Sequence, residues 1–265
     1  MDEYKKFVLS QIGIDRYVLR SNSNKNNNLN KVINEDVLIQ IPPLKKNINK
    51  QSESNQIVEN RQKPLNWQTL TSEIKNCQNC ILSKERKQVV IGTGDLKPDW
   101  LFVGEGPGVE EDQQGLPFVG NSGKLLDNIL LSIGLERGKK VYIANAVKCR
   151  PPGNRPPILD EIAACQNYLH SQISLLKPKI IVAVGKTATV ALLGDDKTPL
   201  GKYRQRHLKF QWNNFSNKFL EPNQPTIPIV VTYHPSYLLR NLNDKIKSWE
   251  DLVLAMDILN KQNNG

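Results

Sequence analysis

The sequence predicts an α/β fold in which a parallel β-sheet is covered by helices on both faces. The apolar runs are short and nearly continuous, as in Ile180–Val184, which is typical of strands buried on both faces. Between these runs, apolar residues recur at helical spacing, and an alternation of strands and helices is the pattern of a parallel sheet. A chain of 265 residues with 38% hydrophobic and 23% charged residues has enough apolar material for one large domain.

The first half of this domain contains two predicted strands with a helix between them. Trp100–Val103 is an uninterrupted apolar run and predicts the first strand. Apolar residues at helical spacing between Leu125 and Ile133 predict a helix, which Gly134 ends. Val141–Ala144 predicts the next strand.

The second half continues the alternation. Pro157–Leu176 predicts a long helix, which ends at Lys177-Pro178 because the residue before a proline avoids the helical conformation. Ile180–Val184 predicts a strand, and a short helix over Ala188–Leu193 follows it.

The C-terminal part adds one strand and one helix. Ile229–Thr232 predicts the last strand. Ser248, with Asp251 three residues later, resembles a capping box and predicts a helix over Trp249–Leu259. Residues 201–228 show no regular pattern, and we assign no element to them.

The first 63 residues differ in composition from the rest of the chain. Residues 21–60 hold eleven Asn and no aromatic residue. Such a segment cannot bury enough apolar surface to offset about 1–2 kcal/mol of backbone entropy per residue. We therefore expect residues 1–63 to form a low-complexity, disordered tail and residues 64–265 to form the folded domain.

The charge and the lack of long apolar runs restrict the class of partner. The formal net charge of +10 favours anionic partners, with nucleic acid first and an anionic membrane surface second. No apolar run approaches the roughly 20 residues that a membrane span needs. Charged residues are spread through residues 1–20, so there is no apolar signal-peptide core. We expect a cytoplasmic protein without a membrane segment.

Four cysteines suggest a metal site. Cys77 and Cys80 form a CxxC pair, and the other two are Cys149 and Cys165. The lack of a signal peptide argues against structural disulfides. A tetrathiolate site suits zinc and an iron–sulfur cluster equally well by count, so the residues alone leave the metal open. Two core cysteines beside a chance CxxC are the remaining alternative.

A glycine-rich loop follows the first predicted strand directly. It begins at Gly104 and runs to Gly123, and in a parallel sheet such a loop is the usual ligand site. It is neither a P-loop nor a dinucleotide fingerprint, because GK[ST] and GxGxxG are both absent from it. Phe118 lies within this loop and either stacks on a flat ring or makes a satellite hydrophobic contact.

Four separated stretches together resemble the family 4 uracil-DNA glycosylases, which carry a [4Fe–4S] cluster. They are the CxxC pair, GEGPGVEEDQQGLPFVGNSG at 104–123, NAVKCRPP at 145–152 with the later Cys165, and HPSYLLR at 234–240. The resemblance covers the chain from about Trp67 to Leu259. It implies a three-layer α/β/α sandwich with a short parallel sheet, and a DNA-repair enzyme that flips uracil out of DNA and hydrolyses its glycosidic bond, leaving an abasic site.

The resemblance also implies roles for individual residues. The four cysteines would ligate one [4Fe–4S] cluster with a structural role. Phe118 would stack on uracil, and Asn145 would read its edge, since a carboxamide offers a donor and an acceptor together. The backbone of Glu105 and Gly106 would line the pocket, and Glu111 would stand where a thymine methyl group would have to go.

The remaining implied roles concern the leaving base and the DNA. His234 would stabilise the negative charge that develops on uracil O2, and Leu238 would wedge into the base stack. Arg240, Lys148 and Arg150 are candidate phosphate contacts. Several of these residues also have a structural alternative: Asn145 could bond to turn backbone, and His234 could be a satisfied structural histidine. Glu111 and Asp112 could be a solvated acidic pair or N-terminal helix charges, and Lys148 and Arg150 a solvated face.

Two questions stay open at this level. Better-known members of the superfamily have a water-activating aspartate where this chain has Gly106, so Glu105, Glu111 or a dissociative mechanism without a strong base could serve here. We expect a monomeric enzyme acting on single- or double-stranded uracil-containing DNA. The competing interpretations are a non-catalytic iron–sulfur DNA-binding module and a zinc-dependent nucleotide hydrolase.

Overall fold

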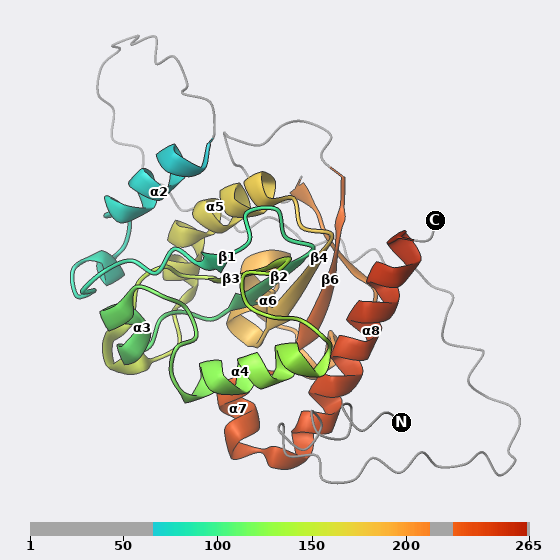
Figure 1. Ribbon diagram of the computed structural model, residues 1–265. Helices are drawn as coiled ribbons and strands as arrows, with labels where there is room; N and C mark the ends of the chain where they lie inside the picture. Colours follow the sequence, from blue (N-terminus) through green and yellow to red (C-terminus); the bar gives the residue numbers. More distant parts are fainter. Residues whose placement is uncertain (1–65, 213–224, 264–265) are drawn as a thin grey trace, which may run out of the picture.

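The computed structural model describes residues 66–212 and 225–263, and the predicted tail of residues 1–63 lies outside them. The described residues contain a six-stranded sheet in the order β1-β3-β2-β4-β6-β5, with helices on both faces (Figure 1). The strands are β1 Thr93–Gly94, β2 Trp100–Gly104, β3 Val141–Asn145, β4 Ile180–Val184, β5 Leu208–Phe210 and β6 Ile227–Thr232. The predicted three-layer α/β/α sandwich is confirmed, and its four central strands are parallel.

The two edge strands were not predicted, and both run antiparallel to their neighbours. β1 pairs with β3 over two residues, and β5 pairs with β6 over three. Strands this short carry no periodicity that a sequence could display. β5 also lies in the stretch 201–228, to which no element was assigned.

The helices form the two outer layers. Their bounds are α2 Trp67–Lys75, α3 Val109–Gln114, α4 Asn121–Ser132, α5 Leu159–Leu176, α6 Lys186–Leu193, α7 Pro235–Arg240 and α8 Lys245–Asn263. Short 3₁₀ turns lie at Ile81–Ser83, Pro152–Asn154, Leu200–Lys202 and Leu242–Asp244. Helices α5 and α6 cover one face of the sheet, with α2 packed on α5, while α4, α7 and α8 cover the other (Figure 1). Among the described residues, no helix has the length and apolar character to cross a membrane.

Alternate residues of each central strand serve the two layers. In β2, Leu101 and Val103 pack toward α5 and α6, while Trp100 and Phe102 pack toward α4 and α8. All four side chains are buried. Burial on both faces explains why the strands appear in the sequence as continuous apolar runs.

The predicted start of the last helix is wrong. Helix α8 begins at Lys245, so Ser248 and Asp251 are interior residues of the helix and form no capping box. The Thr232 hydroxyl donates to Ser248 Oγ at 3.0 Å, and Asp251 accepts a hydrogen bond from Arg204 at 2.8 Å. Their polar side chains form hydrogen bonds with residues that are distant in the chain. A local sequence pattern cannot distinguish such residues from a helix cap.

Candidate functional site

The predicted site residues meet at one edge of the sheet, where the parallel strands end. β2 ends at Gly104 and β3 at Asn145, and these two residues are paired in register. β6 leads into His234, and after β4 the Gly185 N–H donates to Thr232 O at 2.9 Å. The glycine-rich loop, Asn145 and His234 therefore lie together at the carboxyl ends of the strands, where open α/β sheets bind ligands. We call Gly104, Glu105, Phe118, Asn145 and His234 the strand-end site.

Phe118 forms one wall of the strand-end site. Its side chain is buried, and its ring lies against the His234 ring with centroids 5.5 Å apart and planes at 29°. A Cβ atom on Gly104 would lie 2.4 Å from Phe118 Cζ and 2.6 Å from Asn145 Oδ1. Only glycine at position 104 lets the aromatic ring and the amide approach the same stretch of backbone.

Asn145 is buried and has an unused acceptor. Only 2% of the residue is exposed, and its Oδ1 accepts no hydrogen bond from any residue that the structure describes. Its backbone carbonyl, in contrast, accepts a hydrogen bond from Lys148 Nζ at 2.7 Å. A buried acceptor without a donor costs about 1–3 kcal/mol, so this geometry favours a ligand that brings an N–H group to Oδ1.

His234 is held as a neutral hydrogen-bond donor. It caps the N-terminus of α7, and its Nδ1 accepts the backbone N–H of Ser236 at 3.2 Å. Because a backbone N–H can only donate, Nδ1 carries the lone pair and the ring proton lies on Nε2. Burial, helped by the positive charge of Arg240 and opposed by Glu111, lowers the pKa of His234 to about 4. The imidazole is therefore uncharged at neutral pH.

Glu105 is fixed by a residue that sequence analysis did not single out as functional. The Thr187 hydroxyl, in the first turn of α6, donates to Glu105 Oε2 at 2.7 Å. The backbone of Glu105 is fixed as well, because its carbonyl accepts the Val147 N–H at 3.2 Å. At Gly106, a Cβ would lie 2.7 Å from Val147 Cγ2, so glycine is needed for close packing here. The only sequence signal for Thr187 is its place just after β4.

The Glu111 carboxylate binds backbone N–H groups on two sides of the glycine-rich loop and so holds the loop together. Its carboxylate accepts backbone N–H groups of Gly108 at 3.0 Å, Val119 at 2.9 Å and Gly120 at 3.1 Å. These bonds close the turn on either side of Phe118. The carboxylate is thus committed to three backbone donors, which leaves Glu105 as the more available acid of the two.

The predicted phosphate contact at Lys148 is wrong. Only 1% of Lys148 is exposed, and its ammonium group points to the Asn145 carbonyl, so it cannot reach a phosphate at the surface. Burial lowers the pKa of Lys148 to about 8, against the opposing influence of Cys165 and Cys149. Of the other predicted phosphate contacts, Arg240 is exposed, whereas Arg150 is half-buried and donates to Asn154 Oδ1 at 2.7 Å.

Leu238, the predicted wedge, is buried in the free protein. Leu238 is 0% exposed and belongs to the core between α4, α7 and α8. A helical turn places neighbouring residues on different faces, and the next residue, Leu239, is 42% exposed. Leu242, in the following 3₁₀ turn, is 61% exposed. Leu239 and Leu242 are therefore exposed apolar groups close to Leu238 in the chain.

The four cysteines line one cavity, which we call the cysteine cavity. Cys77 and Cys80 follow α2, Cys149 follows β3, and Cys165 lies in α5. The cavity has about 290 Å³ of unfilled space, part of it open to solvent. In the part of the chain that the structure describes, no three His, Cys, Asp or Glu side chains are close enough together to hold a single metal ion.

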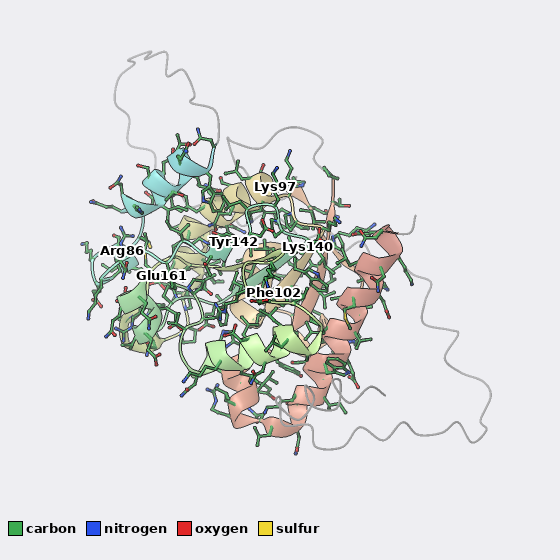
Figure 2. The ribbon with its side chains drawn as sticks, viewed as in Figure 1. Arg86, Lys97, Phe102, Lys140, Tyr142 and Glu161 are labelled. Atoms are coloured by element: carbon green, nitrogen blue, oxygen red, sulfur yellow. The ribbon has the colours of Figure 1, made fainter. Side chains whose placement is uncertain are left out.

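Arg86 donates hydrogen bonds to the rim of the cysteine cavity. Its Nη1 donates to Cys149 Sγ at 3.0 Å, and its Nη2 donates to Cys77 O at 2.9 Å. A second donor is the backbone N–H of Lys148, which lies 3.3 Å from Cys165 Sγ. Arg86 lies on the side of the molecule that carries α2, whereas Phe102 lies in the middle of the sheet (Figure 2). Sequence analysis missed Arg86, because an isolated arginine in a loop matches no motif.

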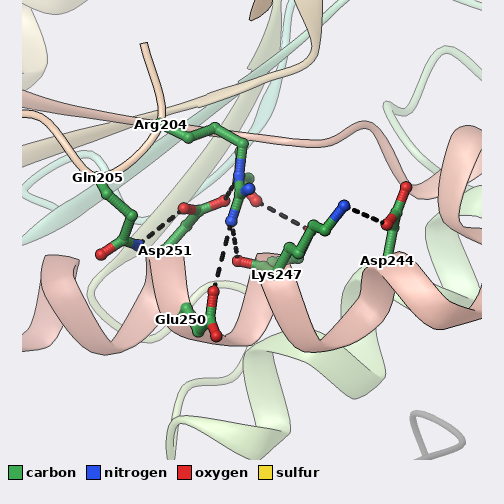
Figure 3. A network of polar contacts seen from close by, with 8 residues as sticks. Arg204, Gln205, Asp244, Lys247, Glu250 and Asp251 are labelled. Atoms are coloured by element: carbon green, nitrogen blue, oxygen red, sulfur yellow. Dashed lines mark hydrogen bonds and ion pairs between the residues drawn. The ribbon is translucent and has the colours of Figure 1, made fainter. Parts of the chain in front are cut away.

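A polar network supports the segment that carries His234. Arg204 donates from Nε to Asp251 Oδ2 at 2.8 Å, and Gln205 donates to Asp251 Oδ1 at 2.9 Å (Figure 3). The Arg204 guanidinium also lies 4.9 Å from the centre of the Tyr233 ring. Tyr233 immediately precedes His234, so this network ties the end of β6 to α8.

Comparisons with known proteins agree with this geometry. The sequence profile of the uracil DNA glycosylase superfamily matches residues 91–253, a range that includes the whole strand-end site. A type-4 uracil-DNA glycosylase of Thermotoga maritima is 38% identical over 195 residues, which cover 73% of this chain and 94% of the relative. One of Saccharolobus solfataricus is 41% identical over 180 residues, covering 66% of this chain and 78% of the relative. A type-5 uracil-DNA glycosylase of Pyrobaculum aerophilum is 32% identical over 114 residues, or 38% of this chain and 50% of the relative.

Proposed function

The chain belongs to the uracil DNA glycosylase superfamily and, within it, to the type-4 enzymes, and from this premise we propose how its residues act. The enzyme hydrolyses the N-glycosidic bond of uracil in DNA and leaves an abasic site for repair. It acts as a monomer on single- or double-stranded DNA. The base must first leave the stack and enter the strand-end site, at a cost of a few kcal/mol.

The unused acceptor of Asn145 is the observation that carries this proposal. Uracil presents an N3–H donor beside its O4 acceptor, so N3–H can donate to the buried Asn145 Oδ1 while O4 accepts from the Asn145 amide. Cytosine has an acceptor at N3 and would leave the same oxygen without a donor. A site with a buried polar group rejects a ligand that fails to pair with it, so Asn145 supports selection of uracil over cytosine.

Phe118 and His234 supply the stacking and the charge stabilisation. The base lies on the Phe118 ring, and the Nε2–H of His234 donates to uracil O2. As the C1′–N1 bond breaks, its electrons pass into the uracil ring and O2 becomes negative. A donor already held on Nε2 stabilises this charge more than it stabilises the bound substrate, and such differential stabilisation accelerates the reaction.

Glu105 is the residue that we assign to the attacking water. The water oxygen bonds to C1′ as the C1′–N1 bond breaks, and the water passes a proton to the Glu105 carboxylate. The departing uracil anion later takes up a proton from solvent. Within the described part of the chain, the Glu105 carboxylate accepts one hydrogen bond, from the Thr187 hydroxyl, and keeps further acceptor capacity. Glu111, with three backbone donors, is better suited to holding the loop.

We assign the cysteine cavity to a [4Fe–4S] cluster. Four cysteines are the ligand set of such a cluster, all four line this one cavity, and the resemblance to the family 4 enzymes implies the cluster. Cys77, Cys80, Cys149 and Cys165 would hold the cluster. When bound, it supplies a cross-link between the loop after α2, the end of β3 and helix α5. Arg86 and Lys148 place positive charge beside its thiolates.

An excision assay with the full chain tests the function. Two oligonucleotides that differ only by uracil or thymine at one position are incubated with the iron-containing protein, and alkali then cleaves any abasic site. We expect cleavage at uracil alone, and strong loss of it in Asn145→Ala with iron content unchanged. DNA binding without uracil release would instead support the non-catalytic iron–sulfur module.

A further inference from the structure

We propose that Arg137 is a positioning residue that holds Phe118 in the backbone conformation needed to stack on the base. This inference rests on the proposed function. Phe118 has a φ of +55°, in the left-handed region that bulky residues rarely adopt. Such a conformation persists only where the surrounding structure enforces it, and in this protein it occurs at the residue that forms the aromatic wall of the strand-end site.

Arg137 contacts both peptide groups that meet at Phe118. It lies in the loop between α4 and β3, and its Nη1 donates to Pro117 O at 3.0 Å while its Nη2 donates to Phe118 O at 2.6 Å. These two carbonyls belong to successive peptide planes, and the angle between those planes is set by φ and ψ of Phe118. A rigid guanidinium that binds both carbonyls therefore fixes these two torsions.

The guanidinium is itself held in place. Arg137 Nε pairs with the carboxylate of Asp127 in α4, and only 26% of the Arg137 side chain is exposed. Three donors of one planar group are thus engaged, two by backbone and one by a carboxylate. This arrangement orients the group as well as supplying charge, and a lysine cannot reproduce it.

Other contacts hold the same peptide from different sides. A Cβ on Gly123 would lie 1.8 Å from Phe118 O, so α4 packs directly against this carbonyl. The next N–H along the chain, that of Val119, donates to Glu111 at 2.9 Å. Gly123 and Glu111 belong to the glycine-rich motif and its turn, whereas Arg137 lies 19 residues from Phe118 and outside every motif found in the sequence.

Loss of Arg137 should release Phe118 toward an ordinary conformation. The ring would then move away from Gly104 and His234, and the flipped base would lose its platform. Misplacement of a positioning group by about 1 Å can lower a rate about 100-fold. We expect Arg137→Met to lower kcat/KM for uracil excision by about this factor.

A double-mutant cycle separates positioning from other roles. Single-turnover excision is measured for Arg137→Met, Phe118→Ala and the double variant, each checked for iron content and melting temperature. If Arg137 acts through Phe118, its loss has almost no further effect once Phe118 is alanine. Independent, multiplicative effects would overturn the proposal and point to a separate role such as DNA binding.

Two further variants control for charge and folding. Lys139→Met removes a positive charge from the same loop at an exposed side chain and should leave excision close to wild type. Arg137→Lys keeps the charge but not the fork, so it should resemble Arg137→Met; full activity in Arg137→Lys would overturn the proposal. A crystal structure of Arg137→Lys tests the positioning role independently of activity, because Phe118 should leave the left-handed region. If wild type releases no uracil, the proposed function fails, while this structural result still decides whether Arg137 sets the conformation of Phe118.

Discussion

The strand-end site and the cysteine cavity are both assembled from distant parts of the chain, but they are held in different ways. The strand-end site stands on the ends of parallel strands, and hydrogen bonds from a backbone N–H and from a hydroxyl fix its His234 and Glu105 side chains. The Ser236 N–H orients His234, and three backbone N–H groups hold Glu111. The cysteine cavity receives hydrogen bonds from both kinds of donor: the Arg86 guanidinium donates to Cys149 Sγ and Cys77 O, and the Lys148 backbone N–H donates to Cys165 Sγ. The first region is organised by the fold, whereas we propose that a bound cluster cross-links the cysteines of the second.

Two contacts connect the regions. Lys148 lies beside Cys149 in sequence, and its ammonium group binds the Asn145 carbonyl at 2.7 Å. Asp112 of α3 is buried and accepts the Lys87 N–H at 3.0 Å, which ties the loop after the CxxC pair to the helix that carries Glu111. Disturbance of the cysteine cavity should therefore reach the strand-end site, while the reverse effect should be small.

The largest effect is expected from Cys149→Ser. Metal binding contributes directly to folding in such sites, so the variant should lose the broad absorbance near ~400 nm of iron–sulfur proteins, together with much of the soluble yield. Iron analysis and a melting curve of the purified variant are the measurements. Full iron content with unchanged stability would contradict the ligand assignment.

His234→Ala should lower the excision rate and leave the iron content unchanged, in contrast to Cys149→Ser. Loss of one well-placed oxyanion donor costs about 100- to 1000-fold in rate, or about 2.7–4 kcal/mol. We expect this loss in single-turnover uracil excision, with iron content and DNA affinity nearly unchanged. If DNA affinity falls as much as the rate, His234 is a binding or structural residue.

The pH dependence of the excision rate tests whether His234 is neutral in the folded protein. Its pKa in the folded protein is lowered to about 4 from an ordinary value of 6.5. Between these values the unfolded chain binds a proton that the folded protein does not, so this group's contribution lowers stability as pH falls through the window. Excision should show no loss from His234 protonation until the pH approaches 4. A rate that falls with an apparent pKa near 6.5 in wild type but not in His234→Ala would show that the histidine is not held neutral.

Lys148→Met tests the connection between the two regions. Methionine has a similar length but provides neither the charge nor the bond to the Asn145 carbonyl. A hydrogen bond from a charged group is worth about 1.5–3 kcal/mol, so excision should fall about 10- to 100-fold. Loss of a positive charge beside the thiolates should also make the reduction potential of the cluster more negative. Unchanged excision together with a shifted potential would show that the two regions are independent.

The sequence predicted best what depends on local apolar pattern. The four central strands and the helices between them appear close to their predicted positions, because burial on both faces leaves continuous apolar runs. The prediction from the sequence was wrong where a polar side chain binds a residue that is distant in the chain. Ser248 and Asp251 imitate a cap but bind Thr232 and Arg204, and the two-residue strand β1 has no pattern to display.

The site shows the same division. The residues singled out by motif resemblance, Glu105, Phe118, Asn145 and His234, lie together at one edge of the sheet. A motif identifies a residue but not the direction of its side chain. Lys148 therefore matched a basic surface in the sequence but is buried in the structure. Residues that position others, such as Arg137, lie outside the motifs and become visible only through their contacts.

The smallest change in excision rate is expected at one of two adjacent leucines of one motif. Leu238 is 0% exposed and Leu239 is 42% exposed. Leu238→Ala should lower the free energy of unfolding by about 2–5 kcal/mol without favouring either DNA form. Leu239→Ala should leave stability unchanged and slow excision about tenfold in duplex DNA, since an apolar side chain that enters the vacated stack is worth about 1.5 kcal/mol or more. Single-stranded substrates need no wedge, so their rate should change little. Measuring both variants on matched single and double strands decides the assignment: a duplex-specific defect in Leu238→Ala would mean that α7 rearranges on DNA and exposes the residue that the free protein buries.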